Sequence, residues 1–195
     1  MKHLVSGENM DTEKNRVCPV RLAKSLDSRI RRWVQSPQKI LAPYVRQGMT
    51  VLDIGCGPGF FSMEMARMVG KGGRVISADL QEGMLQKLGD KTRGTDLEER
   101  IELIKCDKDN INVVGRVDFI LAFFMVHEVP DKHSLFRQMK GILNEKGRVL
   151  LVEPKLFHVS RREFESTIRL AIGVGFKSSK GPSVRFSWSA VLSNA

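Results

Sequence analysis

The sequence predicts an α/β fold with a doubly wound, mostly parallel sheet. Short apolar segments that suit buried strands alternate along the chain with segments of helical periodicity. This alternation is typical of βαβ units, whose strands run parallel. The end of the chain departs from it with two extended segments, which indicate an antiparallel hairpin at one edge of the sheet.

The composition fits one folded domain. The chain has 195 residues, of which 42% are hydrophobic and 28% are charged. Its longest apolar run, 119–126, is shorter than the roughly 20 residues that cross a bilayer. The first residues lack the apolar core of a secretory signal, so we expect a cytoplasmic protein. Cys18, Cys56 and Cys106 are too scattered for a disulfide framework, and we expect reduced thiols.

Positive charge gathers at the start of the chain. The net charge is +10, and residues 1–46 hold ten Lys and Arg against four Asp and Glu. Such a segment could attract nucleic acid, an anionic membrane surface or an acidic substrate, although a solvated helix face is the commoner outcome. Trp33 is the one aromatic residue in the densest stretch, 29–39, which therefore lacks a platform for stacking bases. Pro37 and Pro43 interrupt the helical patches expected between residues 20 and 45.

Three strands are expected in the first half of the sheet. Residues 50–54 (TVLDI) read as a buried strand, and residues 60–70 carry apolar side chains at helical spacing up to a glycine. We expect a second strand at 74–80 (RVISADL), a helix at 82–92 and a third strand at 100–107 (RIELIKCD).

The second half repeats the pattern before it departs from it. Residues 117–124 (VDFILAFF) are apolar enough for a strand that is buried on both faces. Asp131 suits the N-cap of a helix over 131–143, and 147–154 suits a fifth strand. We then expect a helix at 161–175 and extended segments at 176–181 and 185–193, joined through Gly181 and Pro182, with Phe186, Trp188, Ala190 and Leu192 alternating with Arg185, Ser187, Ser189 and Val191.

A glycine-rich turn directly follows the first strand. The stretch VLDIGCGPGF places Gly55, Gly57 and Gly59 after Asp53. Glycines let the chain turn sharply and let a ligand touch the backbone, and the helix that follows offers free N–H groups. Open α/β sheets bind ligands beyond the carboxyl ends of their strands. The turn therefore predicts a ligand site.

Three ligands compete for this turn. A phosphate-binding loop needs Lys and Ser or Thr after the last glycine, where this chain has Phe60 and Phe61. A dinucleotide fingerprint needs a third glycine where Phe60 stands, and Asp53 would repel a pyrophosphate. S-adenosylmethionine (AdoMet) carries no phosphate, and its ammonium and carboxylate match an acid beside a helix N-terminus. The turn favours AdoMet.

Acids at the next two strand ends support this interpretation. Asp79 lies 22 residues after Gly57, where its carboxylate can accept both ribose hydroxyls, although NAD would use it in the same way. Leu80 could pack on adenine. Asp107 could accept from the adenine amino group, and a turn cap is an equally good interpretation of it.

At this point the chain resembles the class I, seven-stranded AdoMet-dependent methyltransferases. VLDIGCGPG, ISADL, IKCDKDNI and DFILAFFMVHEVPD are similar to the motifs of the first four strands of that family. LNEKGRVLLVEP and the terminal GF…RFSWSAVL are similar to its fifth strand and final hairpin. The resemblance covers roughly residues 38–193 and is nearest to the ubiquinone/menaquinone C-methyltransferase-like group of small-molecule methyltransferases.

The resemblance implies a sheet of order 3-2-1-4-5-7-6 with the last strand antiparallel. It divides the chain into a basic N-terminal helical segment, 1–37, and an AdoMet-binding methyltransferase domain, 38–195. With the residue-based arguments above, it predicts a cofactor site made by Asp53, Gly55, Cys56, Gly57, Gly59, Asp79, Leu80, Cys106, Asp107, Phe123 and Phe124, with S-adenosylhomocysteine (AdoHcy) as the product.

The acceptor site is expected from the N-terminal segment and the loops after strands four and five. This chain has little inserted material before the final hairpin, where relatives often build a substrate lid. In MVHEVPD, His127 could take a proton from the acceptor and Glu128 could orient His127 or bind a cationic acceptor, so both are candidate catalytic residues. His127 and His133 lack partners at metal spacing, so we expect no metal. Four further residues could contribute to this rim or cover the cofactor: Glu153, His158, Tyr44 and Trp33.

Three functions follow as hypotheses. The first is in-line methyl transfer to a small-molecule acceptor. The second is an RNA or protein methyltransferase recruited by the basic segment, although the NPPY-type tetrapeptide of amino-group methylators is replaced by AFFM. The third is a non-catalytic module that binds AdoMet or nucleic acid. Cys18 weakly suggests thiol or metalloid methylation.

Overall fold

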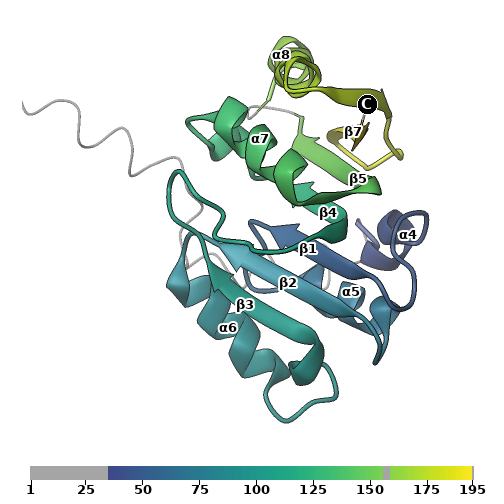
Figure 1. Cartoon of the computed structure of the whole chain (residues 1–195), viewed down its shortest axis with the longest axis vertical. Coiled ribbons are helices and arrows are strands. Elements are labelled where there is room, and N and C mark those ends of the chain that lie inside the picture. The colour runs from purple at the N-terminus through teal and green to yellow at the C-terminus, as the bar shows by residue number, and fades with distance from the viewer. Residues whose placement is uncertain (1–34, 156–158, 195) are drawn as a thin grey trace, which may run out of the picture.

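The computed structural model describes residues 35–155 and 159–194. Figure 1 shows a central sheet with helices packed against it. The elements in chain order are α4 (Pro37–Leu41), β1 (Thr50–Ile54), α5 (Ser62–Val69), β2 (Arg74–Asp79), α6 (Glu82–Thr92), η2 (Glu98–Arg100), β3 (Ile101–Lys105), β4 (Val117–Phe123), η3 (Val126–Glu128), α7 (Lys132–Ile142), β5 (Leu143–Pro154), α8 (Arg161–Gly173), β6 (Phe176–Lys180) and β7 (Ser187–Asn194).

The strands form one seven-stranded sheet in the order β3-β2-β1-β4-β5-β7-β6. β1 pairs in parallel with β2 and β4, and the outer pairs β2–β3 and β4–β5 are parallel as well. β7 runs antiparallel to both of its neighbours, β5 and β6. The predicted fold class, strand order and terminal hairpin are confirmed.

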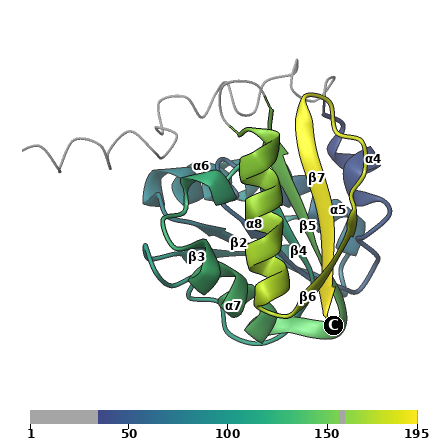
Figure 2. The same cartoon turned by 90° about the horizontal axis from the view of Figure 1, so that it is seen from above.

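Helices cover both faces of the sheet (Figure 2). On one face α7 and α8 bury Phe136, Met139 and Phe164 against alternate residues of the central strands. On the other face α4 and α5 pack Leu41 and Met65 in a second core cluster. The central strands β1 and β4 are therefore buried on both faces, which explains their continuous apolar sequence.

The fifth strand begins earlier than the sequence indicates. α7 ends at Ile142 and the chain becomes extended at Leu143 at once, while the β4–β5 register shifts between Val117 and Phe119. Asp118 ties the strand starts together here, because its carboxylate accepts from the Thr50 N–H at 2.9 Å and from the Asn144 side-chain amide at 2.7 Å. Local periodicity could not reveal such a long-range polar link.

The last strand begins later than expected. Phe186 takes a left-handed φ of 56° and is 57% exposed, so pairing with β5 begins only at Ser187. The expected alternation is only partly observed, because Val191 is buried as well as Ala190 and Leu192. β7 lies between two strands and is covered on both faces, which removes a strict two-residue pattern.

The predicted division at residue 37 falls largely outside the described residues and stays a prediction. Within them, α4 packs against α5 as part of the folded domain. None of the helices in the described part of the chain is long and apolar enough to cross a membrane. The cytoplasmic location stays a prediction.

Candidate active site

The glycine turn after β1 is held by the backbone of β2. Gly55 and Cys56 both donate their N–H groups to the Ala78 carbonyl, at 2.8 and 3.1 Å. Gly55, Gly57 and Gly59 all take positive φ, which favours glycine. A Cβ on Gly55 would lie 2.8 Å from the Met125 Cβ, whereas one on Gly57 would meet nothing within 4 Å. The turn is therefore closely packed at its start and open at its centre.

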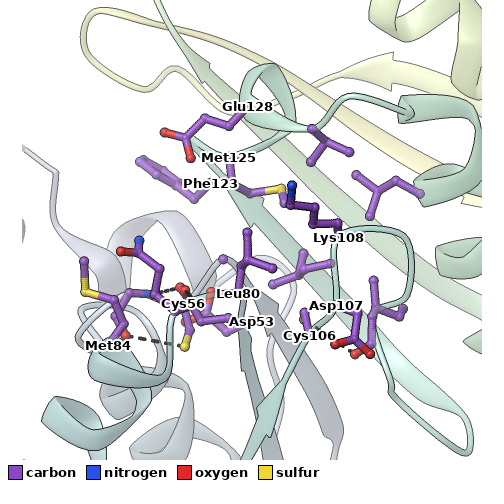
Figure 3. Close-up of a pocket in the computed structure, with 18 of the residues that line it drawn as sticks. Asp53, Cys56, Leu80, Met84, Cys106, Asp107, Lys108, Phe123, Met125 and Glu128 are labelled. Carbon is purple, nitrogen blue, oxygen red and sulfur yellow. Dashed lines mark hydrogen bonds between the residues drawn. The ribbon is translucent and has the colours of Figure 1, made fainter. Parts of the chain in front are cut away.

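A cavity of about 260 Å³ opens beside this turn at the carboxyl ends of the strands. Ten of the eleven predicted cofactor residues line it. Figure 3 shows Asp53, Leu80 and Phe123 among them, which come from separate strand ends. The exception is Gly59, where a Cβ would overlap the Leu88 side chain. Gly59 thus lets α6 pack against the turn and is a structural glycine here rather than a wall of the cavity.

Each of the first two acids is held by local hydrogen bonds. Asp53 is 2% exposed, and the Ser62 hydroxyl donates to its Oδ2 at 2.6 Å. Asp79 accepts from the N–H of Gly57 at one oxygen and from the N–H of Gln81 at the other, both at 2.8 Å. Burial raises the pKa of Asp79, and these two backbone bonds partly oppose the shift. Both carboxylates are thus fixed in direction before any ligand arrives.

The two described cysteines are buried cavity-lining thiols. Burial raises the pKa of Cys106 to about 12, with smaller contributions from the charges of Asp79 and Asp107. Burial also raises the pKa of Cys56 well above its ordinary value, and Asp53 and Asp79 add to the shift. Both thiols stay protonated at neutral pH and are poor nucleophiles. They act as small apolar parts of the wall.

Asp107 stands in a compact loop after β3. Its N–H donates to the Asn110 carbonyl at 2.8 Å, and the Asn112 side-chain amide donates to its Oδ2 at 2.9 Å. Asn112 takes a left-handed φ of 56° in order to reach back. Asp107 is exposed and lines the cavity, and Figure 3 shows it next to Cys106.

Four phenylalanines form a continuous aromatic cluster at the β4 side of the cavity. Phe60 meets Phe61 edge-on at 5.0 Å between ring centroids, and Phe123 lies 4.4 Å from both Phe61 and Phe124. All four rings belong to cavity-lining residues. Phe124 follows the strand with a φ of 58°, a left-handed conformation that is costly for a bulky residue.

His127 is oriented by Glu153, whereas the sequence suggested Glu128 for that role. His127 Nδ1 lies 2.5 Å from Glu153 Oε2, and its Nε2 is 4.0 Å from Glu128 Oε1. Glu153 is 2% exposed and also accepts from the N–H of Val126 at 2.9 Å. Burial lowers the pKa of His127, but the hydrogen bond and charge of Glu153 and the charge of Glu128 outweigh it, so the pKa is raised. Among the described residues, Glu128 lines the cavity and His127 does not.

The remaining candidates lie elsewhere. Tyr44 stacks on Phe119 at 5.6 Å against the sheet and is not among the described residues that line the cavity. His133 is exposed near the start of α7. No group of three metal-binding side chains occurs in the part of the chain that the structure describes. Cys18, Trp33 and His158 lie outside the described residues.

Sequence reasoning missed several residues that shape the cavity. Ser62 holds Asp53, and its position at the start of the helix after the turn was a usable signal. Met125 and Gln138 also line the cavity, but they come from the loop before α7 and from α7 itself, where no strand end marks them. Their role follows only from packing between distant segments.

The cavity is acidic although the chain is basic. Its described lining holds six carboxylates and one lysine, Lys108. The net charge of the whole chain is +10. A site of this kind attracts cations and repels phosphate groups. The acids are Asp53, Asp79, Asp107, Asp109, Glu128 and Asp131.

Comparisons with known proteins agree with this geometry. The family profile described as a methyltransferase domain matches residues 46–175. The ubiquinone/menaquinone biosynthesis C-methyltransferase UbiE of Enterobacter sp. (strain 638) is 33% identical over 110 residues, which are 56% of this chain and 44% of that protein. UbiE of Idiomarina loihiensis is 34% identical over the same shares. The chain thus spans less than half the length of these curated relatives.

Solved structures share the fold. A SAM-dependent methyltransferase from Aquifex aeolicus superposes with a TM-score of 0.79 at 23% identity, covering 90% of this chain and 98% of that one. A TehB-like SAM-dependent methyltransferase from Corynebacterium glutamicum gives 0.68 at 15% identity, with 90% and 93% covered.

The cavity also fits the cofactor of that family. The open position above Gly57 leaves room for a ligand against the backbone, and the acids at three successive strand ends suit a donor that carries an ammonium, two ribose hydroxyls and an adenine amino group. Strand order, glycine turn, acidic cavity and matched profile lead to one conclusion: this chain belongs to the class I AdoMet-dependent methyltransferases.

Proposed function

We propose that the chain transfers the methyl group of AdoMet to a small-molecule acceptor by in-line displacement. The observation that carries the proposal is the character of the cavity, which is acidic and closed on its β4 side by four aromatic rings. Phosphate-rich acceptors would meet six carboxylates there. Neutral or cationic molecules with an apolar body fit this wall better. The UbiE relatives, named for quinone biosynthesis, favour the same direction.

Each of the three acids on the donor side of the cavity would bind a different group of AdoMet. Asp53, fixed by Ser62, would accept from the donor's ammonium. Asp79 would accept from the ribose hydroxyls with the second lone pairs of its two oxygens, because the first are used by Gly57 and Gln81. Asp107 would accept from the adenine amino group. The N–H groups at the start of α5 would face the donor's carboxylate.

Bound AdoMet supplies an activated methyl group on a positively charged sulfur. The chain has to hold the acceptor in line with that methyl group and keep water away, which the rings of Phe61, Phe123 and Phe124 can do from the β4 side. Alignment of this kind can supply several kcal/mol of a reaction barrier, roughly 7–11 in well-oriented systems.

Glu128 is the better candidate for proton removal from the acceptor. Its side chain lines the cavity, and Figure 3 shows its carboxylate beside Phe123. His127 has Nδ1 committed to Glu153, and its raised pKa favours the protonated form, which suits it to fix Glu128 rather than to act as the base. In this proposal Glu128 contacts the acceptor, and His127 lies behind Glu128 outside the cavity lining.

The alternative acceptor is RNA or protein, recruited by the basic residues at the start of the chain. The charge of residues 1–46 favours it. A crystal structure from Clostridium thermocellum described as an rRNA methylase shares the fold at 18% identity, which bears on fold alone. The acidic cavity counts against a nucleic-acid acceptor.

A labelling experiment tests the choice. The full-length protein is incubated with methyl-tritiated AdoMet and cell extract separated into small-molecule, RNA and protein fractions. We expect label in the small-molecule fraction, and much less of it when the Asp79→Ala variant replaces the wild type at a low concentration of AdoMet. Label in RNA or protein alone would overturn the proposal. Salt-sensitive RNA binding without any turnover would instead favour the non-catalytic module.

A further inference from the structure

Gln138 on α7 lies against the loop that carries Asp107. Its Nε2 donates to the Asp109 carbonyl at 2.8 Å, and its Oε1 accepts from the Ile111 N–H at 2.9 Å. The second hydrogen of Nε2 points to the Ser134 hydroxyl at 3.2 Å, one turn earlier on the same helix. The side chain thus binds the loop as both donor and acceptor while its own helix fixes its direction.

The loop depends on such anchors because it has little regular structure. β3 ends at Lys105, and the turn over 107–110 is closed by the Asp107 N–H to Asn110 carbonyl bond. Asn112 ties this turn to Asp107 and to the Lys105 carbonyl, at 2.9 and 3.0 Å. These bonds fix the shape of the loop. The two hydrogen bonds of Gln138 join this loop to α7.

The two bonds of Gln138 meet the loop within its exposed part, at Asp109, and at its buried end, at Ile111. Ile111, which donates to Gln138, is 6% exposed and joins the core cluster that contains α7. Asp107 and Asp109 are exposed at the cavity mouth. Gln138 therefore joins the buried end of the loop to the turn that presents the Asp107 carboxylate, and Gln138 itself lines the cavity.

We propose that Gln138 is a positioning residue for donor selection: by holding the 106–112 loop on α7, it sets how well Asp107 distinguishes adenine from a base with a carbonyl at the same ring position. This inference rests on the proposed contact between Asp107 and the adenine amino group. An amino group donates to a carboxylate, whereas a carbonyl oxygen repels it. The distinction depends on the position of Asp107, because hydrogen-bond energy falls steeply with misalignment.

The experiment compares two ligands and needs no acceptor. Calorimetry measures the dissociation constants of AdoHcy and S-inosylhomocysteine, which differs in carrying a 6-oxo base, for the full-length protein. The variants are Gln138→Ala, Gln138→Met, which keeps the length of the side chain without its hydrogen bonds, and Asp107→Ala. Arg137→Ala is the matched control, because Arg137 is exposed at the neighbouring position of α7.

We expect wild type to prefer AdoHcy by about tenfold or more, as one hydrogen bond to a charged group allows. Both Gln138 variants should reduce that ratio about fivefold, with most of the change in the AdoHcy affinity, and Arg137→Ala should leave it unchanged. Asp107→Ala should abolish the preference. Should Gln138→Ala lose its fold by circular dichroism, Gln138→Met, which preserves the bulk, gives the same comparison.

Two results would overturn the inference. If the Gln138 variants weaken both ligands by the same factor, or neither ligand, the residue only supports the fold. If Asp107→Ala leaves the ratio unchanged, there is no adenine contact for Gln138 to position. Neither result bears on the acceptor, since failure of the proposed function appears separately as label in RNA or protein.

Discussion

The donor and acceptor halves of the cavity hold their acids in different ways. In the donor half, at the ends of β1, β2 and β3, several partners are close in sequence, such as Ser62 for Asp53 and Gln81 for Asp79, although Asp79 also accepts from Gly57, 22 residues away. In the acceptor half, after β4, the loop of Glu128 is fixed by Glu153, which lies 27 residues from Val126 and 26 from His127. The donor half is therefore held more by contacts close in sequence, with Gly57 at Asp79 and Gln138 at the loop of Asp107 as its long-range contacts, whereas the acceptor loop is held by a residue of another strand.

The change with the largest expected effect tests the donor half. Asp79→Ala should weaken AdoHcy binding by about 1–3 kcal/mol, or roughly 10- to 100-fold, because a buried carboxylate and its ribose bonds are lost. Asp79→Asn, which keeps one oxygen for the backbone donors, should lose less. Calorimetry gives the affinities.

Asp90→Ala is the control for this change, since Asp90 lies on the exposed surface of α6, where it pairs with the exposed Arg93. Equal affinity of Asp79→Ala and wild type would reject the ribose assignment. Burial raises the pKa of Asp79, so this carboxylate is protonated at a higher pH than an ordinary aspartate. As the pH is lowered, donor affinity should therefore begin to fall at a higher pH than an ordinary aspartate would give.

A change in the acceptor half should separate binding from turnover. Glu128→Gln should leave the AdoHcy affinity within about twofold of wild type while it slows single-turnover methyl transfer by about 100-fold, the lower end of what a general base supplies. Rates are measured with the acceptor fraction that the labelling experiment identifies. Glu145→Gln, on an exposed part of β5, is the control. An unchanged rate would remove Glu128 from the chemistry.

The smallest expected effect concerns stability and pH. The pKa of His127 is raised above 6.5 in the folded protein, so its contribution to stability is fully present below about pH 6.5 and is lost as the pH rises through the folded-state pKa. We expect a loss of about 1–2 kcal/mol, the size of a charge-assisted hydrogen bond. Thermal unfolding of wild type and His127→Gln between pH 6 and 9 measures it, with the exposed His133→Gln as control. Parallel curves for wild type and His127→Gln would contradict the assignment.

The difference between contacts close in sequence and contacts between distant segments also explains which features could be predicted from the sequence. The glycine turn and Asp79 were identifiable because a strand, a turn and an acid follow one another within a few residues. The sheet order came from the resemblance of the whole set of motifs, and the structure confirms it. The sequence offered Glu128 as a residue that could orient His127 or bind a cationic acceptor, and the closer contact of His127 is with Glu153, since parallel pairing of β4 and β5 brings distant residues together.

Gln138 and Gly59 show the two ways in which local interpretation fails. Gln138 had no motif, because its role depends on where α7 lies relative to the loop after β3. Gly59 had a motif, but its side of the turn faces Leu88 of α6 and not the cavity. The sequence pattern predicted both the glycine turn and the helix that carries Gln138. Which of their residues line the cavity depends on how distant segments pack against them.

The strained backbone of Phe124 affects which substitutions could stabilise the protein. Its left-handed backbone costs roughly 1 kcal/mol or more that a glycine or asparagine at the same position would recover. Selection for heat resistance alone would therefore favour replacing it and would discard the ring that closes the aromatic cluster. A protein that retains Phe124 is less stable than its glycine or asparagine variant would be, and it keeps the aromatic wall of the cavity.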